Sequence, residues 1–143
     1  MTQLLKVKIK RLLPNAVIPC YAKHGDAGMD LVATSITTHD DKITYGTGLS
    51  FEIPVGHVGF IFPRSSIRNK DLSLTNAVGV IDSGYRGEVM ATFIEHYKFG
   101  SDSYDIGDKI AQMIIFPFPT IEFEEVEELT ETERGDGGFG STG

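Results

Sequence analysis

The chain has 143 residues and a mass of 15.7 kDa; 41% of the residues are hydrophobic and 23% are charged. This length suits one domain, and the apolar fraction is high enough to bury a core, which excludes an intrinsically disordered protein. The formal net charge of −7 excludes a broad nucleic-acid surface, because phosphate neutralisation requires clustered lysines and arginines.

The N-terminal stretch MTQLLKVKIKRLL carries basic side chains where a signal peptide would need an uninterrupted apolar segment. No apolar run approaches the length of a membrane span. The single cysteine, Cys20, cannot form an intramolecular disulfide. We therefore expect a cytoplasmic protein that neither contacts a membrane nor depends on disulfides.

Short apolar runs follow one another along the chain, each bounded by Gly, Pro, Asn or Asp. Residues 7–10 alternate between apolar and basic side chains, which is typical of a half-buried strand. Further runs occupy residues 49–53, 55–62, 89–94 and 110–118. Helical periodicity is nearly absent, and residues 65–71 are the one segment that favours a short helix. We predict an all-β fold, a jelly-roll-like β-barrel or sandwich with one short helix.

The composition changes near residue 130. Residues 122–143 hold eight acidic residues and one basic residue, Arg134, and so carry the whole net charge. Apolar residues interrupt the acidic stretch 122–133, which we interpret as a solvated strand and linker rather than a binding tail. Residues 134–143 contain five glycines and form either a disordered tail or a flap that orders over a ligand. We predict a barrel domain over residues 1–130 and a flexible Gly-rich C-terminal arm over residues 131–143.

Common nucleotide and metal motifs do not explain the sequence. Residues 135–140 match G-x-G-x-x-G, but no helix follows them, as a dinucleotide-binding fold would require. The four histidines lie far apart without the spacing of zinc ligands.

Two segments in the first half of the chain carry polar groups suited to anion chemistry. Residues 27–31 (AGMDL) place the Asp30 carboxylate just before a strand-like stretch. Residues 63–66 (PRSS) bring a guanidinium and two hydroxyls to the start of the short helix, where anions bind well, although a serine there is as often only a helix cap.

Two further segments carry a carboxylate and an amide. Residues 76–88 (NAVGVIDSGYRGE) indicate a strand, a turn and a second strand, with Asp82 beside the tip, where aspartate is usually a turn former. In residues 107–112 (GDKIAQ), Gln112 lies inside an apolar strand and needs a polar partner.

In this order, and together with residues 134–143, these four segments resemble the five motifs of the trimeric dUTP pyrophosphatases (dUTPases) along essentially the whole chain. Residues 67–71 (IRNKD) depart from the commoner small and apolar residues after the second motif. The resemblance implies hydrolysis of dUTP to dUMP and pyrophosphate, by attack of water on the α-phosphorus with Mg²⁺ bound to the triphosphate. This reaction keeps uracil out of DNA and supplies dUMP for thymidylate synthesis.

The resemblance also implies roles for individual residues. Asp82 would orient and deprotonate the water, and Tyr85 would stack under the deoxyribose and exclude a 2′-hydroxyl. The segment 76–90 would pair its polar groups with the uracil edge, through Asn76, Gly79, Val80, Ile81 and Met90. Phosphate oxygens would be held by Arg64, Ser65, Ser66 and Gln112, of which Arg64 and Gln112 would be catalytic together with Asp82.

The metal and the arm complete the implied site. Asp30 would hold Mg²⁺ through water, since this ion keeps several waters and prefers phosphate oxygens. Arg134, Ser141 and Thr142 would close on the β- and γ-phosphates, while Phe139 stacks on uracil and Gly140 lets the backbone approach. The resemblance further implies a homotrimer in which residues 63–66 with Gln112, the Asp82 hairpin and the arm come from three different chains.

Three other interpretations remain at this point. A deoxycytidine triphosphate deaminase is similar in fold and in the Asp82 segment, and a bifunctional deaminase–pyrophosphatase is a variant of that idea. A regulator that binds dUTP without turnover, and a protein partner through the acidic segment, is the non-enzymatic alternative.

Overall fold

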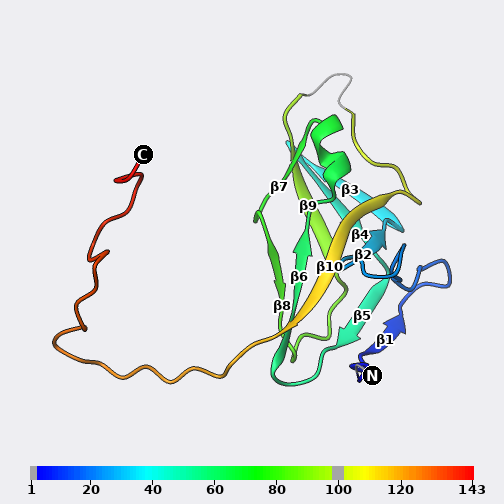
Figure 1. Ribbon diagram of the computed structural model, residues 1–143. Helices are drawn as coiled ribbons and strands as arrows, with labels where there is room; N and C mark the ends of the chain where they lie inside the picture. Colours follow the sequence, from blue (N-terminus) through cyan, green and yellow to red (C-terminus); the bar gives the residue numbers. More distant parts are fainter. Residues whose placement is uncertain (1–2, 98–101) are drawn as a thin grey trace.

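A computed structural model describes residues 3–97 and 102–143 (Figure 1). The described part contains strands β1 (Lys8–Arg11), β2 (Met29–Val32), β3 (Ser35–His39), β4 (Lys42–Gly46), β5 (Leu49–Glu52), β6 (His57–Phe62), β7 (Leu72–Leu74), β8 (Gly79–Ile81), β9 (Met90–Glu95) and β10 (Lys109–Pro117). Its one helix is the 3-10 helix η1 (Ser65–Asn69). The fold is all-β, as the sequence predicts.

Two four-stranded antiparallel sheets form the body of the protein. Their strand orders are β2–β10–β6–β8 and β3–β4–β9–β7, and β1 pairs with β5 in a separate ribbon. One core cluster takes buried side chains from both sheets, among them Leu31, Tyr45, Ile61, Phe93 and Met113. The sheets therefore pack face to face in a jelly-roll-like arrangement, and hydrogen bonding among the described strands does not run around a closed barrel.

An aromatic cluster occupies one end of this core. The rings of Tyr45, Phe93 and Tyr104 lie with centroids 5.7–6.1 Å apart in edge or tilted contacts. The Tyr45 hydroxyl donates to the carbonyl oxygen of Tyr104 and accepts from its N–H, both at 2.9 Å. These contacts hold the chain before β10 against the sheet that contains β4.

Two local expectations need correction. The helical segment is shorter than residues 65–71, because Lys70 is already extended (φ −117°, ψ 152°). Residues 76–90 do not form a paired hairpin in the described structure: β8 pairs with β6, whereas β9 pairs with β4 and β7. The backbone of Val89 bonds to Leu49 and Thr47 instead, which carries the chain from one sheet to the other.

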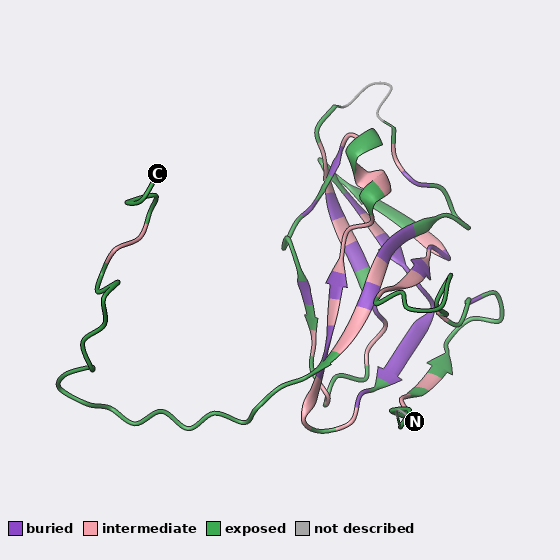
Figure 2. Cartoon of the chain, viewed as in Figure 1, coloured by how far each residue is buried: buried purple, intermediate pink, exposed green. Residues whose placement is uncertain are grey.

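Residues 118–143 run away from the sheets without a helix or strand (Figures 1 and 2). The strand expected within residues 122–133 is therefore absent, since no strand among the described residues pairs with this segment. Large apolar side chains on this segment are exposed, including Ile121, Phe123 and Leu129. Among the described residues, no helix is long and apolar enough to cross a membrane.

Candidate active site

Three neighbouring strands bring Asp30, Arg64 and Gln112 together. Gln112 on β10 lies opposite Asp30 on β2 and opposite Phe62, the last residue of β6. Arg64 follows β6 by two residues, and its Nε donates to Asp30 Oδ1 at 2.7 Å. Gln112 Nε2 donates to the carbonyl oxygen of Pro63 at 3.0 Å, which supplies the polar partner expected from the sequence. Asp30 lies inside β2 rather than just before it.

Gly28 leaves room for this arrangement. A Cβ built on Gly28 would collide with the carboxamide oxygen of Gln112. The first motif thus contributes a carboxylate and also the space in which the Gln112 side chain lies.

Lys109 joins the cluster because of an irregularity in β10. The pairing with β2 shifts register between Lys109 and Ala111, so that Lys109 lies opposite Val32 and Ala111 opposite Leu31. In a regular strand, residues three apart point to opposite faces, and a bulge re-aims one of them. Lys109 Nζ consequently lies 3.6 Å from Asp30 Oδ2, on the same face as Gln112.

The charges of this cluster favour an anionic ligand. Asp30 is one carboxylate between two cations, Arg64 and Lys109, so the group carries a net positive charge. The Asp30 and Arg64 side chains are 22% and 30% exposed, so their pair is partly shielded from water and still reachable. A guanidinium and an ammonium at such a place suit phosphate oxygens.

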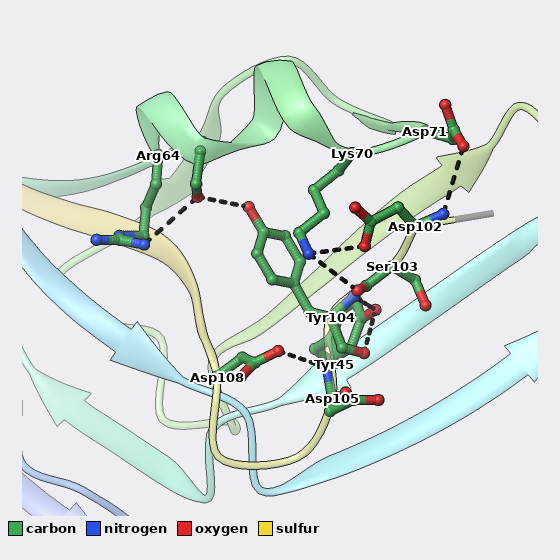
Figure 3. A network of polar contacts seen from close by, with 10 residues as sticks. Tyr45, Arg64, Lys70, Asp71, Asp102, Ser103, Tyr104, Asp105 and Asp108 are labelled. Atoms are coloured by element: carbon green, nitrogen blue, oxygen red, sulfur yellow. Dashed lines mark hydrogen bonds and ion pairs between the residues drawn. The ribbon is translucent and has the colours of Figure 1, made fainter.

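The two serines at η1 differ in their contacts. Arg64 occupies the N-cap position, and no side-chain hydrogen bond caps this described helix, so neither serine acts as its cap. Ser65 is exposed. The Ser66 hydroxyl receives a long hydrogen bond, 3.4 Å, from Arg64 Nη1 and lies 3.0 Å from the Tyr104 hydroxyl (Figure 3).

A second group of site residues lies around the turn after β8. A hollow of about 270 Å³ is lined by Val80, Ile81, Asp82, Tyr85, Glu88 and Met90, among others. The Tyr85 N–H donates to the carbonyl oxygen of Asp82, and the Tyr85 hydroxyl donates to that of Glu88 at 3.0 Å. A Cβ at Gly87 would collide with the Tyr85 ring. Asn76 and Gly79 lie just before this hollow, with Gly79 buried opposite Ile61 on β6.

The arm carries the third group. Its last residues surround an open hollow of about 750 Å³, lined by Arg134, Phe139, Gly140, Ser141 and Thr142, among others. Arg134 Nε donates to the carbonyl oxygen of Gly137 at 3.0 Å. The Phe139 ring is fully exposed, and its residue has a positive φ of 55°. Figure 1 shows the arm extending away from the sheets.

One chain does not bring these groups together. Ile81 lies opposite Gly59 in the middle of β6, whereas Arg64 follows the end of this strand. The five residues from Gly59 to Arg64 therefore separate Asp82 from Arg64 by on the order of 15–20 Å at the usual rise per residue, although Gly79, opposite Ile61, lies closer to the first group.

The described residues do not form a metal cage of protein ligands either. The described residues contain no group of three or more His, Cys, Asp or Glu side chains that could hold an ion. Asp30 can still accept a hydrogen bond from a metal-bound water, because each carboxylate oxygen has two lone pairs. The donor set therefore fits an ion that arrives with its phosphates and waters, and does not fit a bare one.

Sequence reasoning missed Lys109 and Tyr104. Lys109 was visible within the fourth motif, but its odd separation from Gln112 predicts the opposite face unless a bulge is recognised. Tyr104 precedes that motif and carried no signal, because its contact with Ser66 joins residues 38 positions apart.

The comparisons with known proteins agree over the whole chain. The dUTPase family model matches residues 14–143. The "Deoxyuridine 5'-triphosphate nucleotidohydrolase" of Corynebacterium glutamicum is 42% identical over 146 aligned residues, covering 100% of this chain and 98% of that protein. The protein of the same name from Nocardia farcinica is 40% identical, covering 100% of this chain and 88% of that one.

Solved structures give the same result. A mutant Staphylococcus bacteriophage 80alpha dUTPase with dUpNHpp has a TM-score of 0.82 at 27% identity, covering 96% of this chain and 98% of that chain. A mutant dUTPase of phage phi11 of S. aureus, described as coordinating a structural Mg(II) ion, has a TM-score of 0.71 at 28% identity, covering 87% and 98%. This chain belongs to the dUTPase family.

Proposed function

We propose that this protein hydrolyses dUTP to dUMP and pyrophosphate with Mg²⁺, as a homotrimer in the cytoplasm. The observation that carries the proposal is the match of the dUTPase family model to residues 14–143, which span all five motifs. The positive cluster at Asp30, Arg64 and Lys109 supports it independently, because a triphosphate is the most highly charged part of the substrate.

In this proposal, each complete active site of the trimer is built from residues of three chains. The separation of Arg64 from Asp82 along β6, and the exposed arm, support contributions from different chains. One chain would supply residues 63–66 and Gln112, a second Asp82 with its turn, and a third the arm. Closed threefold symmetry would make the three sites equivalent.

The residue roles in this proposal are those that the family resemblance implies. Asp82 would accept a proton from the attacking water as its oxygen bonds to the α-phosphorus, and the bond to the bridging oxygen of pyrophosphate would break. Arg64, Ser65, Ser66 and Gln112 would hold phosphate oxygens and stabilise their charge. Bound Mg²⁺ would neutralise phosphate charge, held through water by Asp30.

Base and sugar recognition would occur at the hollow of about 270 Å³. This volume suits a base and sugar rather than a whole nucleotide. Backbone groups of Gly79, Val80, Ile81 and Met90, and the Asn76 amide, would pair with uracil. Tyr85 would lie under the deoxyribose and exclude a ribose.

The barrel over residues 1–130 and the arm over residues 131–143 would act as separate parts. The arm would close as a flap, with Phe139 stacked on uracil and Arg134, Gly140, Ser141 and Thr142 on the β- and γ-phosphates. Its exposed, unpaired course is consistent with this role.

One assay tests the activity. The protein is incubated with dUTP, dCTP or UTP and Mg²⁺, while pyrophosphate and ammonia are followed. Pyrophosphate from dUTP alone is the expected result. Ammonia from dCTP would show a deaminase instead, and binding of dUTP without turnover would show a regulator.

A further inference from the structure

Tyr104 contacts Ser66, one of the proposed phosphate-binding residues, from the side of the core. It is 4% exposed, and its ring packs against both core aromatics, Tyr45 and Phe93. Its backbone is bonded on both sides to the Tyr45 hydroxyl. Lys70 Nζ lies 5.0 Å from the centre of its ring and bonds to Asp102 Oδ1 and to the carbonyl oxygen of Ser103 (Figure 3). The Tyr104 hydroxyl is thus fixed in space.

This fixed hydroxyl reaches the second motif. It lies 3.0 Å from Ser66 Oγ, which is its one hydrogen-bond partner among the described residues. Ser66 Oγ also accepts a hydrogen bond from Arg64 Nη1. A row of three side chains therefore leads from the core to the Arg64 guanidinium.

The direction of the middle hydrogen bond follows from counting protons. A serine hydroxyl has one proton to donate and two lone pairs that accept. A tyrosine hydroxyl likewise has one proton to donate and can also accept. If Ser66 donated to Tyr104, the buried Tyr104 proton would have no acceptor in the described part of the chain, at a cost that buried donors rarely bear. If Tyr104 donates, the lone pairs of Ser66 are both used and the Ser66 proton is left over.

We infer that Tyr104 is a positioning residue: its hydroxyl donates to Ser66 Oγ and thereby directs the Ser66 proton toward a phosphate oxygen of the bound nucleotide. Arg64 Nη1 donates to Ser66 Oγ, so the Ser66 proton cannot point toward Arg64. The half-buried Ser66 hydroxyl therefore donates toward the solvent, where the phosphate would bind. The inference rests on the proposed function, because it assigns the acceptor to a phosphate of the substrate.

The test compares ligands with and without phosphates. Tyr104→Phe keeps the ring and its Lys70 contact and removes only the hydroxyl. We expect it to weaken binding of dUpNHpp with Mg²⁺ about tenfold, as for an oriented hydrogen bond to a charged group, and to change binding of deoxyuridine less than twofold. Damage to the fold would instead weaken the binding of dUpNHpp and of deoxyuridine to a similar extent.

A double-mutant cycle with Ser66→Ala isolates the pair. In the Ser66→Ala background, Tyr104→Phe should change dUpNHpp affinity less than twofold, because the proton that it directs is gone. Thr34→Val is the control for loss of a buried hydroxyl: Thr34 Oγ1 bonds to the Gly46 carbonyl oxygen away from this row. It should lower the unfolding temperature and leave both affinities unchanged.

Equal losses for the two ligands, or additive effects of the two substitutions, would overturn the inference. Should Tyr104→Phe not fold, Ser66→Ala decides alone, and unchanged dUpNHpp affinity in that variant overturns it. Release of pyrophosphate from dUTP by the unmodified protein is measured alongside. If it occurs while Tyr104→Phe binds normally, only the inference is wrong; if it does not occur, the proposed function is wrong.

Discussion

Asp82 and Arg64 are separated along β6: Asp82 follows Ile81, which pairs with Gly59 in the middle of this strand, and Arg64 lies five residues beyond Gly59, past the end of the strand. This separation between the proposed base and the proposed phosphate clamp of one chain supports the proposal that a complete site takes them from different chains. This relationship gives the assembly of the site a direct test.

The first prediction is complementation between two defective chains. One carries Asp82→Asn and the other is truncated after Glu133, and the two are co-expressed so that trimers mix. If the turn and the arm come from different chains, random mixing leaves roughly a quarter of the sites intact. Native mass measurement confirms that trimers mix. Mixed trimers that stay at the activity of the separate variants would show that one chain supplies both elements.

The second prediction concerns Asp82 itself. Asp82→Asn is nearly isosteric, so the fold and the affinity for dUpNHpp should remain. Turnover should fall by about 10²–10⁴, the usual contribution of a general base. Steady-state release of pyrophosphate measures this, and near-normal turnover would remove Asp82 from that role.

The third prediction uses the absence of tryptophan. Phe139→Trp would introduce the only indole of the chain, so its emission reports on that position. Closure over uracil should change the emission when dUpNHpp and Mg²⁺ are added, whereas UTP should not change it. Phe139→Ala should weaken the complex by about 1–3 kcal/mol, the usual value of base stacking. An unchanged spectrum at saturating dUpNHpp would mean that the arm does not stack there.

The fourth prediction tests the space at Gly28. Gly28→Ala places a methyl group against the carboxamide of Gln112, which can move because it is the end of a flexible side chain. Thermal stability should change little, while kcat/KM for dUTP falls toward that of Gln112→Ala. In the Gln112→Ala background the Gly28→Ala change should have little further effect. Equal effects in both backgrounds would separate Gly28 from Gln112.

The fifth prediction is an alkaline loss of stability through Tyr45. Burial raises the pKa of the Tyr45 hydroxyl above its ordinary value of 10.0. The folded state therefore holds this proton more tightly than the unfolded state, so the contribution is complete below pH 10 and is lost as the pH rises through the raised pKa. Unfolding measured from pH 8 to pH 11 should show a shallower decline in Tyr45→Phe. Tyr97→Phe removes an exposed hydroxyl and should keep the original slope.

Much of the local structure was readable from the sequence, because it depends on residue type and spacing. Short apolar runs bounded by Gly, Pro, Asn and Asp predicted the strands, and the polar group of Gln112 inside such a run predicted a partner, which is Pro63. The five motifs identified the family, because their order can be recognised in the sequence without knowing which strands pair.

Pairing and long-range contact were decided only by the tertiary structure. The sequence of residues 76–90 is compatible with a hairpin, but β8 and β9 belong to different sheets, and between them Val89 bonds to Thr47 and Leu49. The bulge that turns Lys109 toward Asp30, and the packing that brings Tyr104 to Ser66, involve partners far apart in the chain. Local propensity carries no information about such partners, because which of them meet depends on the free energy of the whole core.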